Sequence, residues 1–190
     1  MLYFQWILAN LVGGLIIGVL SRPGDFLMHM VLRGLLISLA QWPVMRRVRS
    51  KARHWIWITS IGLVLSNLPI VAPFAPVNDW LRIAAMNLHS ELGLWEVFWL
   101  NLLNEGQIWF LVGIAQWIFL RKQAPFWIVA ALLGGLNLGA TSATICFTFC
   151  GSLDGFAGTL MTNAIVAGGG WAAYGMVTGW ALKMDVVSSG

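Results

Sequence analysis

Apolar residues fall into long continuous stretches along this chain, separated by short polar or charged breaks. A helix needs about 20 mostly apolar residues to cross a bilayer. Six stretches approach that length, and few of them contain a charge. We therefore expect an all-α fold, an integral membrane bundle of about six transmembrane helices in a single domain. The predicted spans are residues 6–20, 26–45, 55–71, 108–120, 126–147 and 156–182.

Residues 74–106 depart from this pattern because polar and acidic positions interrupt the apolar ones. Asn78-Asp79 and Ser90-Glu91 are residue types that begin helices, and apolar residues follow each pair at helical spacing. We expect amphipathic interfacial helices here, between the third and fourth spans. Two interpretations stay open: a helical lid over the bundle, or a docking surface for a partner. The docking candidates are Trp80, Glu91, Trp95 and Glu96.

Composition supports a membrane protein and excludes several other classes. The 190 residues are 59% hydrophobic and 9% charged, whereas soluble domains carry roughly 25% charged residues. A soluble domain, a disordered tail and a disulfide-rich secreted module are therefore excluded. Lys and Arg are not interleaved with aromatic residues on a polar face, so we expect no nucleic-acid binding. Residues 1–20 lack a basic start and a cleavage site, which favours a retained span.

The charges separate into two groups when the spans are threaded back and forth. Eight of the eleven Lys and Arg residues would then share one side, in the turns at 46–53 and 121–122 and at Lys183. Six of the seven acidic residues would lie on the opposite side. Lys and Arg are enriched in short cytoplasmic loops. We therefore expect both termini in the cytoplasm and the acidic segment outside it.

The spans also repeat. The block 40–47, Ala-Gln-Trp-Pro-Val-Met-Arg-Arg, matches the block 115–122, Ala-Gln-Trp-Ile-Phe-Leu-Arg-Lys. A second pattern, Trp-Ile followed by spaced glycines, begins at Trp6 and at Trp127, with a weaker copy at Trp55. Self-similarity of this kind indicates a repeat architecture, which here predicts three helical hairpins. Trp and basic residues anchor span ends, and small residues let membrane helices pack closely.

Arg33 is the side chain most informative about function. It lies about 10 Å into its span at 1.5 Å per residue, and intramembrane charges are costly and often functional. Aligning the two Ala-Gln-Trp blocks makes Glu105 the nearest counter-ion. We expect a structural Arg33–Glu105 ion pair. The alternatives are a solute- or proton-handling cluster with His29, and an Arg33 side chain that extends to the surface.

Histidine and cysteine provide the remaining candidate chemistry. The three histidines do not share metal-ligand spacing, so we expect no metal site. His29 and His54 are candidate axial ligands for the magnesium or iron of a tetrapyrrole, with a structural hydrogen-bonding role as the alternative. Cys146 and Cys150 lie on the acidic side, where a disulfide is one interpretation and two buried thiols the other.

The alternating hairpins, with Ala-Gln-Trp and two basic residues at one end and Trp-Ile with spaced glycines at the next, resemble a loose group of uncharacterised multi-pass bacterial proteins. Many of those proteins are cyanobacterial. The resemblance covers residues 1–67 and 107–139. It implies a bacterial inner or thylakoid membrane, with a photosynthetic complex as host and chlorophyll or carotenoid as the pigment. It implies no activity and no functional residue.

Three functions fit these residues. Because no catalytic constellation is recognisable, we expect a non-enzymatic accessory or scaffold subunit, with the bilayer and other membrane-complex subunits as its partners. The alternative is a small solute or proton transporter or channel that uses Arg33, His29 and Glu105, since transporter sites often form between structural repeats. A membrane enzyme acting on lipids, with His89, Glu91 and Glu96 at its site, is the third and weakest interpretation.

Overall fold

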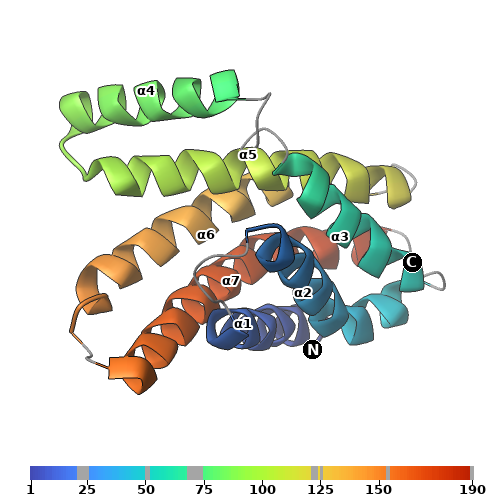
Figure 1. Ribbon diagram of the computed structural model, residues 1–190. Coiled ribbons are helices and arrows are strands. Elements are labelled where there is room, and N and C mark those ends of the chain that lie inside the picture. Colours follow the sequence, from blue (N-terminus) through green and yellow to red (C-terminus); the bar gives the residue numbers. More distant parts are fainter. Residues whose placement is uncertain are drawn as a thin grey trace.

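The computed structural model describes residues 1–20, 26–49, 52–67, 75–120, 124, 126–152 and 155–188, without the side chains at 26–29, 75–76, 78 and 185–188. These residues form seven α-helices and no strand (Figure 1), which confirms the all-helical class. The turns expected at 21–25 and 121–122 lie outside the described residues. The helices are α1 (Leu2–Leu20), α2 (Phe26–Val48), α3 (Arg53–Ser66), α4 (Ala75–Leu92), α5 (Glu96–Phe119), α6 (Trp127–Phe149) and α7 (Gly155–Ser188).

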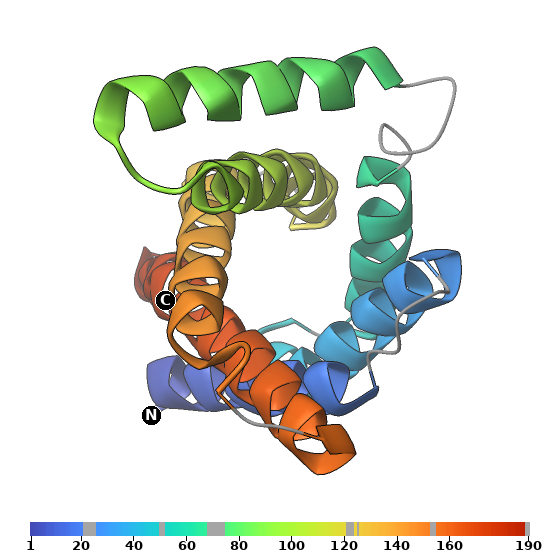
Figure 2. The ribbon, with the colours of Figure 1, turned by 60° about the vertical axis from the view of Figure 1, so that its left-hand side comes forward.

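Six of these helices form a closed ring. In the order α1, α2, α3, α5, α6 and α7, each helix packs against the next, and α7 packs back against α1. Figure 2 is viewed nearly along the axis of the ring and shows α4 outside the ring, beside α5. The two ends of the chain are therefore neighbours in space although they are far apart in sequence. Three successive helix pairs, α1–α2, α3–α5 and α6–α7, correspond to the three hairpins expected from the repeats.

Three of the described helices, α1, α5 and α6, are long and apolar enough to cross a membrane, fewer than the six expected. The shortfall has physical causes in the other three ring helices. The α3 helix has 14 residues, below the usual length of a span. In α2, Arg33, Gln41 and a basic last turn lower the hydropathy of the described residues, which do not include the side chains at 26–29. Many glycines and threonines do the same in α7.

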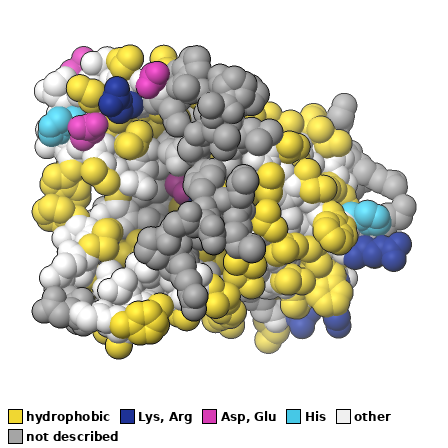
Figure 3. All heavy atoms as spheres, in the orientation of Figure 1, with side chains coloured by type: hydrophobic (Ala, Val, Ile, Leu, Met, Phe, Trp, Pro, Cys, Tyr) yellow, Lys and Arg dark blue, Asp and Glu magenta, His cyan; other side chains and the backbone are white. Residues whose placement is uncertain are grey.

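The ring helices bury polar side chains and expose apolar ones, the reverse of a soluble protein. Asn10, Gln41, Thr59, Gln116 and Thr178 are all buried to 1% exposure or less. The outer surface is largely hydrophobic (Figure 3). Its exposed large apolar side chains come from every ring helix and include Leu8, Leu32, Trp57, Phe110, Leu133 and Trp180. Such a surface suits a lipid environment, because exposed apolar patches of this extent are rare on soluble monomers.

Charge distinguishes the two ends of the ring. At one end, here called the basic end, α2 finishes and α3 begins, with Arg46, Arg47 and Arg53 exposed. The opposite, acidic end carries Glu91 in the last turn of α4 and Glu96 at the start of α5, while Asp79 lies earlier on α4. Figure 3 shows basic side chains gathered at the right and most acidic ones at the upper left, where a basic side chain also lies among them.

The insert contains one separate helix rather than two. Ser90 and Glu91 lie in the last turn of α4 instead of beginning a second helix. The stretch from 96 to 106, expected within the insert, is the first half of α5. Glu105 lies in this half, and its charge is offset by an ion pair inside the ring, so the acidic residue does not end the helix. Asn78 and Asp79, expected to begin a helix, lie inside the first turns of α4, which begins at Ala75.

Candidate functional site

A chain of buried hydrogen bonds links the ring helices at the basic end. Trp6, Trp55 and Trp127 begin the three hairpins, and their rings meet edge to face with centroids 5.6–6.2 Å apart. Each indole Nε1 donates to the neighbouring hairpin: to Thr178 Oγ1 at 2.9 Å, to Gln41 Oε1 at 2.9 Å and to Gln116 Oε1 at 3.0 Å. The three hairpins therefore make equivalent contacts around a pseudo-threefold axis.

The two glutamines continue this chain within their own hairpins. Gln41 Nε2 donates to Asn10 Oδ1, and Gln116 Nε2 donates to Thr59 Oγ1, both at 2.9 Å. The third hairpin has Thr178 where the others have glutamine, and its hydroxyl donates to the Tyr174 carbonyl on its own helix. We call the eight residues the indole–amide circuit: Trp6, Asn10, Gln41, Trp55, Thr59, Gln116, Trp127 and Thr178.

The Arg33–Glu105 ion pair lies inside the ring on the acidic side of this circuit. Arg33 Nη2 donates to Glu105 Oε2 at 2.6 Å, and the two side chains are only 10% and 12% exposed. This is the pairing that the aligned repeats predict. Arg33 precedes Gln41 on α2 by eight residues, which places the pair about 12 Å from the circuit. The pair joins the first hairpin to the second.

Two tryptophans complete the surroundings of the ion pair. Trp109 Nε1 donates to Glu105 Oε2 at 3.2 Å, so this oxygen accepts from both an indole and a guanidinium. The Arg33 Cζ atom lies 5.4 Å from the centre of the Trp171 ring on α7, a cation–π distance. The charges are thus held by α2, α5 and α7, one helix from each hairpin.

Glycines fix the helices that carry the two charges. A Cβ atom on Gly34, next to Arg33, would lie 2.8 Å from the Ser60 Cα of α3. A Cβ atom on Gly135 of α6 would lie 2.6 Å from the backbone oxygen of Glu105. These approaches hold α2 against α3 and α5 against α6 at the level of the ion pair, as small residues do between membrane helices.

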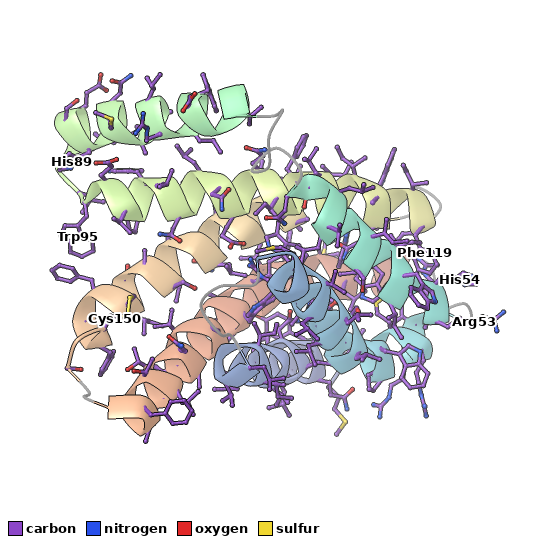
Figure 4. The ribbon with its side chains drawn as sticks, viewed as in Figure 1. Arg53, His54, His89, Trp95, Phe119 and Cys150 are labelled. Carbon is purple, nitrogen blue, oxygen red and sulfur yellow. A yellow bond between two sulfur atoms is a disulfide. The ribbon has the colours of Figure 1, made fainter. Side chains whose placement is uncertain are left out.

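His54 lies far from the ion pair, and the position of His29 is known only for its backbone, because its side chain is outside the described residues. His54 is exposed at the basic end, with its ring 6.3 Å from that of Phe119 (Figure 4). Within the described part of the chain, no three His, Cys, Asp or Glu residues are grouped to hold a metal ion.

Cys146 and Cys150 form a disulfide at the acidic end of α6. It borders a cavity of about 630 Å³ whose walls include Trp95, Phe98 and Val166. The Trp95 ring stacks on Phe147 at 3.7 Å, and Figure 4 shows Trp95 close to this end of α6.

The other three docking candidates lie on α4 and at the start of α5. Trp80 and Glu91 are exposed on α4, and Glu96 is half-buried. The structure therefore brings Glu91, Trp95 and Glu96 to the acidic end, whereas Trp80 lies about 16 Å from Glu91 along α4.

Sequence inspection missed several residues that the site uses. Thr178 escaped notice because it is shorter than the glutamine it replaces, and Thr59 because threonine is common in helices. Trp109 could have been found, since it lies one turn after Glu105 on the same face. No sequence signal linked Trp171 to Arg33.

The paired charges can hold three hairpins together, or they can separate when protons or ions bind. They provide no nucleophile. The chain matches no protein-family model, no curated protein and no solved structure. The site therefore has to be interpreted from its own side chains.

Proposed function

We propose that this chain is a six-span integral membrane protein that acts as a non-enzymatic accessory or scaffold subunit of a larger membrane complex. The observation that carries the proposal is the indole–amide circuit, whose buried polar groups bond to one another across hairpins. Polar groups inside a membrane bundle that are paired in this way stabilise helix association. Groups already committed to one another are unsuited to binding a substrate.

The ring supports the proposal of six spans independently of hydropathy. The helices α2, α3 and α7 pack beside the three apolar helices around the ring. All six contribute exposed apolar side chains to its outer surface. If α1, α5 and α6 cross the membrane, their ring neighbours are surrounded by the same lipid. Both termini then lie on the basic side, which the distribution of Lys and Arg assigns to the cytoplasm.

Helix α4 is the proposed docking element. It buries Leu81 and Ala85 and exposes Trp80, Ile83 and Met86. Among the described helices its main neighbour is α5, so a large part of its apolar surface is not covered by the ring. The resemblance to cyanobacterial proteins makes a photosynthetic complex the proposed host, and His54 with the outer aromatic side chains the proposed pigment contacts.

Purification of the tagged protein in mild detergent tests this proposal. We expect co-purifying membrane subunits, identified by mass spectrometry, that are lost in the Trp80→Ser/Ile83→Ser variant and retained in Arg82→Gln, the exposed control on the same helix. An absorption spectrum of the complex tests pigment binding. A protein that runs alone and colourless, with the native fold, would contradict the accessory role.

A second function, transport of a solute or protons, is favoured by one observation. A buried ion pair lies between helices of different repeats, the place where transporter sites often form. Reconstituted vesicles test it with the swapped variant Arg33→Glu/Glu105→Arg. A structural pair is expected to tolerate the swap without any change in ion flux, whereas a translocation site would show flux in the native protein and lose it in the variant.

A further inference from the structure

A groove on the outer surface of the first hairpin has the form of a lipid-binding site. It has a volume of about 300 Å³ and lies between α1 and α2 near the basic end. Its apolar walls are Leu8, Ala9 and Val12 on one helix and Ala40, Pro43 and Val44 on the other. Gln5 and Arg47 close the end nearest the basic surface. The groove runs about 10 Å along α1, from Gln5 to Val12.

The groove exists because the two helices are close at one level and lined with small residues beyond it. A Cβ atom on Gly13 would lie 2.8 Å from Ile37 Cδ1 and 3.1 Å from the Ala40 Cβ atom. Between this contact and the basic end, Ala9 and Ala40 leave space that longer side chains would occupy.

The pseudo-threefold repeat places larger side chains at some of the equivalent positions of the other two hairpins. In the second hairpin, Ile58 and Phe119 stand at the positions of Ala9 and Val44, and the Phe119 ring contacts Trp55 and His54. In the third hairpin, Trp180 stands at the position of Pro43. The second hairpin therefore has bulky side chains at the positions of Ala9 and Val44, whereas the third has alanine at both, at residues 130 and 181.

The charge at the end of the groove is positive. Arg47 is exposed, and its Nη1 donates to Gln5 Oε1 at 2.8 Å. A guanidinium has five N–H donors, so donors remain for a further acceptor. Arg46 is adjacent, with its Cζ 5.5 Å from the Trp42 ring centre. The four acidic side chains that the structure describes lie on α4 and the first half of α5, away from this end.

We propose that this groove binds an anionic phospholipid of the leaflet at the basic end. An acyl chain lies along the apolar walls, and the phosphate accepts hydrogen bonds from Arg47, with Arg46 adding charge. Arginine suits this role because it binds phosphate through paired N–H groups, and basic residues at a membrane surface favour anionic lipids. The proposal rests on the membrane placement proposed above.

Native mass spectrometry of the full-length protein in detergent tests the site. Dioleoyl phosphatidylglycerol is compared with dioleoyl phosphatidylcholine, and we expect one tightly bound lipid with a preference for phosphatidylglycerol. Arg47→Gln is expected to weaken that binding roughly fivefold, whereas Arg53→Gln, an exposed basic control at the same end, leaves it unchanged. Ala9→Ile/Val44→Phe, which introduces the residues of the second hairpin, is expected to abolish the tight site.

Three results would overturn the proposal: equal occupancy by the two lipids, equal losses in Arg47→Gln and Arg53→Gln, or a filled-groove variant that retains the bound lipid. Inorganic phosphate at the same concentration is the remaining arm. Stabilisation of the native protein by phosphate alone would indicate an anion site without a lipid. Unchanged melting temperatures of the variants in detergent alone show that they fold. A protein that stays soluble without detergent would contradict the membrane placement instead.

Discussion

Arg33 and Glu105 show how a charge is tolerated inside the ring. Each side chain is about nine-tenths buried, and the carboxylate accepts hydrogen bonds from both Arg33 and Trp109. The attraction between two such charges adds little net stability. Removal of one partner is costly, however, because it leaves the other charge buried and unpaired.

Single substitutions of the pair should therefore cost more than the double substitution. We expect Glu105→Leu or Arg33→Met to lower the free energy of unfolding by about 3 kcal/mol. The double variant Arg33→Met/Glu105→Leu should recover most of that loss, because apolar replacements of a buried pair are often neutral. Unfolding in detergent, arranged as a double-mutant cycle, measures the coupling. Additive losses in the double variant would show that the two charges do not depend on each other.

Gly135 and Gly62 provide a matched pair for testing close helix contact. A methyl group on Gly135 would lie 2.6 Å from the Glu105 carbonyl oxygen, whereas one on Gly62 would make an ordinary 3.6 Å contact with Ala115. We expect Gly135→Ala to lower stability by about 1–3 kcal/mol through overpacking. Gly62→Ala should be neutral or stabilising by up to about 1 kcal/mol, because alanine favours helix. Thermal unfolding in detergent measures both. Equal effects would contradict the close approach of α5 and α6.

At the scale of the helices, the indole–amide circuit distributes a few polar groups over the whole ring. Gln41 joins α1, α2 and α3, and Gln116 joins α3, α5 and α6. The hydrogen bond from Trp6 to Thr178 closes the ring between α1 and α7. Each indole is fully buried, so its N–H depends on its single acceptor.

Replacement of Gln116 by leucine should therefore affect three helices. The substitution leaves the Trp127 N–H and the Thr59 hydroxyl without partners, and an unsatisfied buried group costs about 1–3 kcal/mol. We expect a loss of about 2 kcal/mol in unfolding free energy. Gln107→Leu, on the same helix and outside the circuit, should change stability by less than about 0.5 kcal/mol. Indole fluorescence during denaturation measures both variants, and similar losses in the two would contradict the role of the circuit.

The repeated blocks predicted the parts of this fold that depend on equivalent residues. Alignment of Gln41 with Gln116 predicted hairpins and also brought Glu105 to Arg33. Hydropathy predicted the spans less well. Some residues that face the interior of the ring are polar, because the hydrogen bonds of the circuit or the ion pair satisfy them. Hydropathy therefore predicts that the start of α5 belongs to the insert rather than to a span. Thr178 and Trp171 could not be predicted, because their roles depend on the closure of α7 against α1.

At the scale of the whole molecule, the ring is nearly symmetric at the level of the circuit and asymmetric at the ion pair and on its outer surface. Its equivalent buried layers, such as Met45, Leu120 and Leu182, are all 2% exposed or less. The departures are α4, found only in the second hairpin, the groove of the first hairpin, and the disulfide of the third. The hairpins therefore differ at the buried ion pair and on surfaces that lipid or a partner can reach.

The number of membrane crossings can be tested by parity. Six crossings place the N- and C-termini on the same side, whereas the three helices that satisfy length and hydropathy alone would place them on opposite sides. Reporter fusions at each terminus should therefore both be active in the cytoplasm. Fusions that report opposite compartments would rule out six crossings.

Single cysteines test the orientation independently. Arg53 and Glu91 are exposed at opposite ends of the ring, and the two native cysteines are joined as a disulfide, so they give little background with a maleimide. We expect a membrane-impermeant maleimide to label Glu91→Cys in intact spheroplasts and Arg53→Cys only after permeabilisation. The reverse pattern would place the basic end outside the cytoplasm, against the usual bias of Lys and Arg. Labelling of both variants before permeabilisation would mean that the ring does not span the membrane along its axis.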